Sequence, residues 1–326
     1  MKKILLATTM LAGTAGFAAA EVAITGYAEM GIWSDKDGDV QFWQDVEVTF
    51  GMSGTTDGGL EFGATIDLDE GDVAIDSGDC AGACSNDDSG TSVYISGSFG
   101  KLTMGDTDGA IDWALQDAAA LTSIADDHTT HVAWFGATGL DGQGDGQVAR
   151  YENTFGAVSF AISAEQEDDG AAGGADDIWG VGVKYTADLG GTALNLGLAY
   201  QAGNGDNAFD ATADVNVDAI GVSVGAELAS GFSASLGYIQ YDFEPAAATD
   251  IDHMGLGLTY TTGALSMHAN YGVYSPSVGA DVDSFGVAVN YDLGGGAVVM
   301  AGYGSDVDAV TAGDQDQWSI GLGMSF

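Results

Sequence analysis

Basic residues are scarce in this chain. Six Lys and Arg stand against 49 Asp and Glu among 326 residues, so the formal net charge is −43 at pH 7. Phosphate binding needs basic patches, and this balance therefore argues against nucleic acid as a partner. It is typical instead of cation attraction, divalent-ion binding or a high-salt habitat. Acidity with few apolar residues would predict disorder, but 46% hydrophobic residues and only two prolines favour ordered strands.

Long apolar runs are missing as well. An apolar stretch from Ile4 to Phe17 follows a basic start and precedes three alanines, which is typical of a secretory signal peptide. We therefore predict a signal peptide at 1–20 and one mature domain at 21–326. No later run reaches the roughly 18 apolar residues that a spanning helix needs. If the mature chain enters a membrane, it must do so as strands.

Cysteine is limited to Cys80 and Cys84, with Ala-Gly-Ala between them. An exported chain meets an oxidising compartment, and the small intervening residues allow a tight turn, so we predict a local loop disulfide. Redox catalysis is the alternative interpretation, although it usually uses C-x-x-C beside a helix.

Catalytic motifs are absent too. The sequence holds no G-x-S-x-G, P-loop or dinucleotide fingerprint, and His128-Thr-Thr-His131 lacks the Glu of a metalloprotease helix. We predict that the protein is not an enzyme and has no cofactor. Segments 35–39 and 106–109 have the start of a calcium loop without its bidentate Glu, which leaves weak calcium binding in the acidic loops as an open alternative.

What the sequence does contain is alternation. From Trp318 to Phe326 every second residue is apolar, and only Gly and Ser stand between. A soluble strand would place charged residues on its second face, whereas an apolar outer face and a polar inner face are typical of a transmembrane barrel. Such runs recur along the chain and predict an all-β fold, a transmembrane antiparallel β-barrel of sixteen strands. The expected strands start near residues 22, 41, 60, 91, 101, 147, 157, 177, 192, 214, 231, 251, 264, 282, 296 and 315.

Short connections alternate with longer polar ones along this barrel. Outer-membrane barrels show the same asymmetry, with tight periplasmic turns and longer outer loops. An even number of strands then places both termini on the periplasmic side. The longer connections are expected at 69–90, 167–176, 201–214, 244–250 and 305–314.

The third outer loop is longer than these, with about forty residues at 106–146. A loop of that length in a compact fold is usually functional. The lumen of a barrel this large is an aqueous channel, and we expect the third loop to fold into the lumen and narrow it. Its acidic side chains would then set selectivity by charge. Residues 111–121 of the loop are expected to form a short helix. The predicted constriction residues are Asp106, Asp108, Asp112, Asp117, Asp126, Asp127 and Arg150.

Strand parity predicts which side chains of the wall face the lumen. Arg150 shares a strand face with Val148 and Glu152, so it should face the third loop. A slip of one residue would reverse every such assignment, and each carboxylate can alternatively be a non-specific wetting residue of the wall. The other predicted lumen residues are Glu29, Glu47, Glu61, Asp67, Glu165, Lys184 and Glu227.

The chain resembles the Gram-negative general porins, in particular the trimeric porins of alphaproteobacteria. The segments that carry the resemblance are 21–27, 98–106 before the third loop, 148–153 after it, and the terminal Phe326. It implies a homotrimer in the lipid bilayer of the cell outer membrane, with acidic residues on the third loop and a basic cluster on the facing wall. It also implies that Phe326 is recognised by the outer-membrane assembly machinery. Here Arg150 is the only arginine, which suggests a constriction dominated by negative potential.

We therefore predict a passive outer-membrane channel for small hydrophilic solutes, with a preference for cations. A substrate-specific channel is one alternative, and it would need an aromatic slide or a basic track. An acidic, β-rich surface adhesin or structural protein is another, and it would be expected to carry charges on both strand faces or internal repeats. The predicted location is the cell outer membrane, reached by export with a cleaved signal peptide.

Overall fold

A computed structural model describes residues 20–34, 40–69, 90–118, 121–124, 131–141, 147–166, 176–207, 210–244, 250–305 and 316–326. These ranges contain sixteen strands and one short helix. The elements are β1 (Glu21–Ser34), β2 (Val40–Thr55), β3 (Glu61–Asp69), β4 (Ser92–Gly97), β5 (Gly100–Gly105), α1 (Ala110–Ala114), β6 (Val148–Phe155), β7 (Val158–Glu165), β8 (Asp176–Asp188), β9 (Thr192–Asn207), β10 (Asp210–Leu228), β11 (Phe232–Glu244), β12 (Ile251–Thr262), β13 (Leu265–Pro276), β14 (Val282–Gly294), β15 (Ala297–Gly304) and β16 (Gln317–Ser325).

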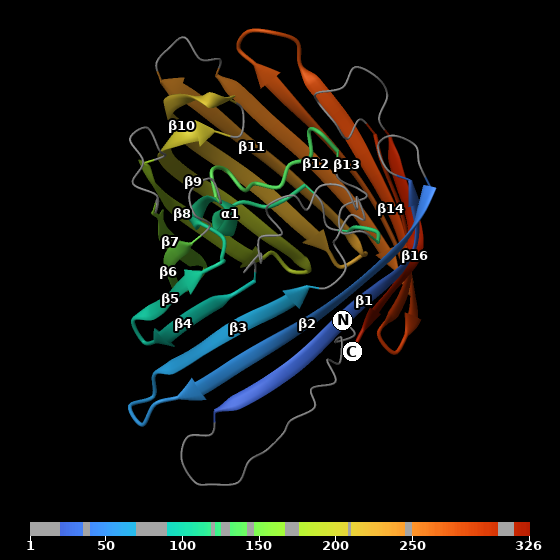
Figure 1. Ribbon diagram of the computed structural model, residues 1–326, viewed down its shortest axis with the longest axis horizontal. Helices are drawn as coiled ribbons and strands as arrows, with labels where there is room; N and C mark the ends of the chain where they lie inside the picture. Colours follow the sequence, from blue (N-terminus) through green and yellow to red (C-terminus); the bar gives the residue numbers. More distant parts are fainter. Residues whose placement is uncertain are drawn as a thin grey trace, which may run out of the picture.

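The strands close into one antiparallel barrel, in which each strand pairs with its neighbours in the chain and β1 pairs with β16 (Figure 1). Closure leaves no strand edge in the lipid, where unpaired backbone groups would cost several kcal/mol each. At the seam Met30 lies opposite Leu322. The backbone N–H of Phe326 donates to the carbonyl of Gly26 at 2.8 Å, and the N–H of Gly26 donates back at 3.3 Å. The predicted sixteen-stranded barrel is confirmed.

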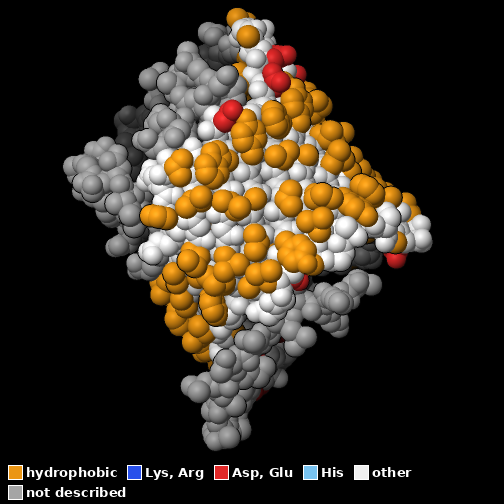
Figure 2. Space-filling model, turned by 90° about the vertical axis from the view of Figure 1, so that its right-hand side faces the viewer, with side chains coloured by type: hydrophobic (Ala, Val, Ile, Leu, Met, Phe, Trp, Pro, Cys, Tyr) orange, Lys and Arg blue, Asp and Glu red, His pale blue; other side chains and the backbone are white. Residues whose placement is uncertain are grey.

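Apolar side chains cover the outside of the barrel. Leu258 is 52% exposed and Val222 47% exposed, while their neighbours Gly257 and Gly221 are buried on the inner side. Figure 2 shows hydrophobic side chains spread over one outer face, with acidic ones only near its edges. An apolar outer face is what lipid requires, and it does not favour the soluble adhesin alternative. Among the described residues, no helix is long and apolar enough to cross a membrane.

The two ends of the barrel differ in their connections. Both chain termini lie at one end, since Tyr27 in β1 is opposite Ser325 in β16, and the connections at that end are short. One expected loop is wrong: at 201–214 the strands continue, with β9 ending at Asn207 and β10 starting at Asp210. The sequence at 201–214 is largely polar and lacks the apolar alternation by which the other strands were recognised.

The third loop lies within the ring of strands, where α1 faces β7, β8 and β9 (Figure 1). The helix is shorter than the expected 111–121, because it ends at Ala114. Leu115 has an extended backbone, with φ −87° and ψ 167°. The next amide, on Gln116, donates to the Ser223 hydroxyl of the wall at 2.9 Å and not to a helical carbonyl. A contact with the wall therefore replaces the second helical turn.

Candidate functional site

The third loop follows the inner wall in two arms. Its outgoing arm, residues 107–118 and 121–124, begins beside β7 and ends against β1 and β16, where a Cβ on Gly31 would lie 2.3 Å from the Ile124 side chain. Its return arm, residues 131–141, comes back on the side of the longer connections. The N–H of Ala118 donates to the carbonyl of Phe135 at 3.0 Å and joins the two arms. The loop therefore occupies part of the lumen and narrows the passage.

Glycines on the inner wall make room for the loop. A Cβ at Gly257 in β12 would lie 1.5 Å from the carbonyl oxygen of Ala118, and one at Gly272 in β13 would lie 1.6 Å from that of Ala133. Real side chains do not approach so closely, so the loop can take this path only where the wall carries no side chain. The many glycines at inward positions thus have a structural purpose, the close approach of loop and wall backbones.

Wall serines hold the loop by hydrogen bonds to its backbone. Their hydroxyl oxygens accept the loop amides directly, which satisfies N–H groups that the loop cannot pair within itself. Besides the bond from Gln116 to Ser223, Ala110 N donates to Ser163 Oγ at 2.8 Å and Ala133 N to Ser284 Oγ at 3.0 Å. These bonds come from three different strands, so they define the position of both arms.

Apolar contacts add a small core between loop and wall. Ile111 and Phe135 of the loop are fully buried, and Ile239 of β11 is 1% exposed. They belong to one cluster that also includes inward residues of β8 to β12. Burial of such a side chain stabilises by about 1.5–3 kcal/mol. The loop is therefore packed along the wall from β6 to β14 and reaches β16 and β1 at Ile124, and the wall formed by β2 to β5 is left facing the passage.

The described basic residues gather on one wall. Arg150 of β6 is buried, with Nε 3.1 Å from a carboxylate oxygen of Glu152 and a terminal nitrogen 3.6 Å from that of Asp108. It also donates to the Asp108 carbonyl. Lys184 Nζ of β8 lies 3.9 Å from the ring centre of Trp113 in α1. Arg150 is therefore matched by two carboxylates and contributes little free positive charge to the lumen.

The acidic residues on the outgoing arm raise one another's proton affinity. Withdrawal from bulk water and the charge of Asp108 raise the pKa of Asp112 to about 6, although Arg150 and Lys184 act in the opposite direction. For Asp117, which has one side open to the lumen, withdrawal from water and the charges of Asp112 and Asp108 raise the pKa to about 7. A cation that passes close to these carboxylates favours their charged form and is attracted by it.

Asp141 closes the loop onto its own start. One of its carboxylate oxygens accepts the N–H of Gly109 at 2.7 Å, and the other accepts the side-chain amide of Gln201 in β9. Burial raises the pKa of Asp141 to about 7, against the lowering effect of these two bonds. The sequence analysis did not include Asp141 in the constriction, because its partners are distant in the chain and no local pattern marks them.

The structure describes only some of the other residues that were predicted for the constriction and the disulfide. Asp106 is exposed and accepts the N–H of Gly90. Asp126 and Asp127, together with Cys80 and Cys84, lie outside the described residues. Their predicted roles stay predictions.

The predicted lumen carboxylates lie on the inner side of the strands. Glu29 is 4% exposed and accepts the Tyr27 hydroxyl at 2.8 Å and the Trp43 indole N–H at 3.2 Å. Asp67 accepts the Thr49 hydroxyl at 3.0 Å. Glu165 is buried near Asp141, Glu47 is half-buried, and Glu61 and Glu227 are exposed to the lumen. The inner wall of β1 to β3 is therefore acidic.

A histidine network that the sequence analysis missed anchors the return arm. His131 Nε2 lies 2.6 Å from the side-chain oxygen of Asn270, and Nδ1 contacts the Ser284 hydroxyl. The Asn270 amide lies 3.1 Å from His268 Nε2, and His253 Nε2 lies 3.0 Å from the Ala133 carbonyl. Strand parity could have placed His253 and His268 inside, but not their contacts with the loop.

No metal centre is assembled within the described ranges, since they hold no group of three His, Cys, Asp or Glu that could ligate an ion. Of the two calcium-like segments, 35–39 lies outside the described residues. In the other, 106–109, Asp108 is 3.6 Å from Arg150 and is therefore already paired with a cation.

Comparisons with known proteins identify a matching family and similar barrels. A family model described as Gram-negative porin matches residues 7–325. A protein of Rhodobacter capsulatus named porin is 31% identical over 297 residues, which cover 86% of this chain and 93% of that protein. A solved porin structure superposes with a TM-score of 0.68 at 25% identity, over 94% of this chain and 100% of that chain. An anion-selective porin from Comamonas acidovorans has a TM-score of 0.64 at 17% identity over the same shares, and the latter likeness shows the fold alone.

Replacement of Gly257 by alanine should disturb the loop. The added Cβ would lie 1.5 Å from the Ala118 carbonyl oxygen, and overpacking of this kind costs about 1–3 kcal/mol. We expect a lower thermal midpoint and a shifted, noisier single-channel conductance in planar bilayers. Gly51→Ala is the matched control, because a Cβ there meets nothing within 4 Å. Equal behaviour of the two variants would contradict the close approach of loop and wall.

Acidification should loosen the return arm. Burial lowers the pKa of His131, and its bond to Asn270 acts in the opposite direction. A lowered native pKa means that the neutral ring stabilises the anchored arm fully above about pH 6.5, and that this contribution is lost as the pH falls through the native pKa. We expect the hydrogen-exchange protection of residues 131–141 to fall below about pH 6.5, and the His131→Gln variant to lose this step.

Other groups near the return arm titrate in the same pH range, and a comparison of wild type with His131→Gln separates their effect from that of His131. Asp112, Asp117 and Asp141 take up protons in this range in both proteins, and His253 and His268 are likewise common to both. The difference between wild type and His131→Gln therefore reports His131, together with its effect on the pKa of His253. An identical pH response in both proteins would exclude His131 as the acid-sensitive anchor.

Proposed function

The chain belongs to the Gram-negative porin family, and from this premise we propose that its barrel is a passive diffusion channel for small hydrophilic solutes that prefers cations. A porin is a channel of the outer membrane and not an enzyme, so discrimination rests on the size and charge of the passage. Sieving at the loop and electrostatic partitioning by the lumen carboxylates supply both.

The observation that carries the cation preference is the imbalance of free charge at the loop. The described basic residues, Lys101, Arg150 and Lys184, lie on β5 to β8, and Arg150 is paired with Asp108 and Glu152. The described carboxylates of β1 to β3 and of the outgoing arm outnumber these three basic residues. In a lumen with low-dielectric walls, unbalanced carboxylates raise the local concentration of cations.

The fold does not decide the sign of the preference. The Comamonas acidovorans porin has a similar barrel and is anion-selective. Selectivity must therefore come from the charges that each chain places on the same framework. The acidic lumen of this chain favours the opposite sign.

Several features of assembly belong to the same proposal. Residues 1–20 act as a cleaved export signal, the mature barrels associate as trimers, and the assembly machinery recognises Phe326. The Phe326 side chain is 67% exposed at the barrel end, where another protein can reach it. The predicted Cys80–Cys84 disulfide completes the proposal, and weak calcium binding in the acidic outer loops stays the alternative to a chain without a cofactor.

Reversal potentials in a KCl gradient test the preference. We expect the wild-type channel to favour potassium over chloride, and the triple variant Asp108→Asn, Asp112→Asn, Asp117→Asn to favour it less, because the outgoing arm then loses its negative charge. Asp57→Asn, in an exposed turn outside the lumen, is the matched control and should leave the ratio unchanged. A wild-type preference for chloride would refute the proposal.

A further inference from the structure

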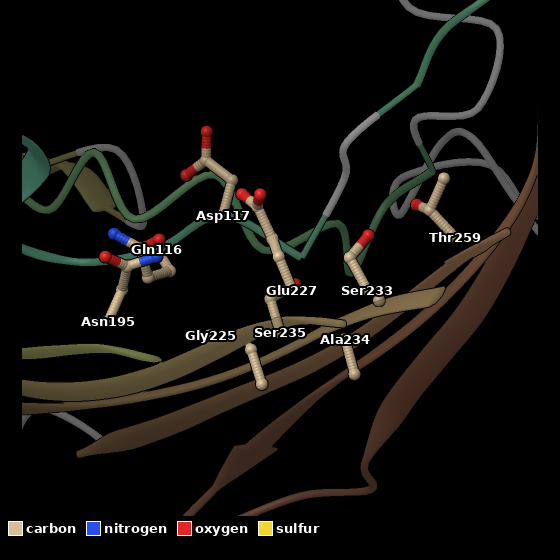
Figure 3. A pocket seen from close by; sticks show the side chains of 11 residues that line it. Gln116, Asp117, Asn195, Gly225, Glu227, Ser233, Ala234, Ser235 and Thr259 are labelled. Carbon is tan, nitrogen blue, oxygen red and sulfur yellow. The ribbon is translucent and has the colours of Figure 1, made fainter. Parts of the chain in front are cut away.

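A polar niche lies beneath the outgoing arm, on the side of the short turns. It has a volume of about 180 Å³ and is lined by Gln116 and Asp117 of the loop and by residues of β9 to β12. Figure 3 shows Asp117 and Glu227 projecting into the same open space, with Gln116 and Asn195 together at one end. Glu227 is close to the end of β10, so a solute meets the niche between the constriction and the periplasmic mouth.

The lining combines negative charge with hydrogen-bonding groups. Two carboxylates, Asp117 and Glu227, share it with two carboxamides and with the hydroxyls of Ser233, Ser235 and Thr259. Asp117 and Glu227 make no hydrogen bond to another described residue, which leaves their oxygens open to a solute. Carboxylates accept bonds and carry charge, whereas amides and hydroxyls both donate and accept. The set thus matches an ammonium group that is attached to a hydroxylated chain.

Hydrogen bonds to residues outside the niche hold several of its lining residues in place. The Thr259 hydroxyl lies 2.8 Å from His268 Nδ1, and the Ser235 hydroxyl donates to the Ala118 carbonyl at 3.4 Å. The backbone N–H of Gln116 donates to Ser223, which fixes the loop above the niche. Groups that are already ordered lose less entropy when a solute binds.

The described part of the lining lacks aromatic side chains, and this limits the kind of solute that the niche can bind. None of the described residues that line the niche is aromatic, so a sugar ring finds no stacking surface there. Gly225 keeps the floor open, since a Cβ at that position would lie 3.2 Å from the Gln116 side-chain oxygen. Recognition must therefore come from charge and hydrogen bonds, not from ring contact.

We propose that this niche is a binding station for small polyhydroxylated organic cations, which hold their ammonium group between Asp117 and Glu227 and their hydroxyls against Asn195, Ser235 and Thr259. The inference rests on the proposed channel function, because a station in the lumen acts only on solutes that pass. Such a solute dwells in the niche and interrupts the ion current while it is bound.

Current block by N-methylglucamine tests the station. Single-channel currents are recorded at about pH 8, above the pKa of about 7 of Asp117, and block is expressed against each variant's own open current. Sorbitol has similar hydroxyls without the charge, and tetramethylammonium has the charge without hydroxyls. We expect N-methylglucamine to block and the other two to leave the current uninterrupted. Block by tetramethylammonium equal to that by N-methylglucamine would overturn the proposed recognition.

Matched variants locate the block. Glu227→Gln should raise the half-blocking concentration about fivefold, the upper range for a solvent-exposed ion pair. Glu61→Gln removes the same charge near the same end of the barrel, but from β3, and should leave the block unchanged. Asn195→Asp adds a carboxylate to the niche and should strengthen the block, a gain that misfolding cannot mimic. Equal weakening in Glu227→Gln and Glu61→Gln would overturn the niche in favour of general lumen charge.

The reversal potential separates this inference from the proposed cation preference. A chloride-preferring wild type that is still blocked through Glu227 would refute the preference and keep the niche. A potassium-preferring wild type whose block ignores Glu227 would refute the niche and keep the preference.

Discussion

No backbone N–H or C=O group can face lipid without a partner, and the rest of this structure depends on that constraint. It requires closure, which β1 and β16 provide through a seam that the chain end extends at Phe326 and Gly26. Closure fixes one face of every strand towards lipid and the other towards the lumen. The inner face is thereby released from any need to be apolar or bulky. It can carry the glycines and serines against which the third loop lies.

Alternation along single strands was readable from the sequence because its cause is local. The run from Trp318 to Phe326 needs only the two-residue period of a strand to predict its apolar face. Sixteen strand starts follow from the same rule, and parity placed Lys184 on the lumen wall. Its contact with Trp113 of the loop was not predicted. The extension of β9 and β10 through 201–214 could not be read, because its sequence lacks that alternation.

The contacts of the loop could not be predicted, because each joins residues far apart in the chain. His131 meets Asn270 and Ser284, and Asp141 meets Gln201. No spacing rule links such positions. The early end of α1 has the same origin, since a wall hydroxyl takes the amide that a second helical turn would have used. Loop position also determines electrostatics, because it brings Asp108 to Arg150 and withdraws Asp112 and Asp117 from bulk water.

The position of the third loop against the inner wall determines both the width and the charge of the passage, and a cross-link tests it directly. A Cβ on Gly180 would lie 3.4 Å from that of Ala110, close to the separation of about 3.5–4.5 Å in disulfides. In a chain with Cys80→Ser and Cys84→Ser, the pair Ala110→Cys and Gly180→Cys should cross-link in outer membranes, and the pair Ala110→Cys and Gly51→Cys should not. Absence of the first cross-link, with free labelling of both cysteines by a maleimide, would contradict a loop held on the wall.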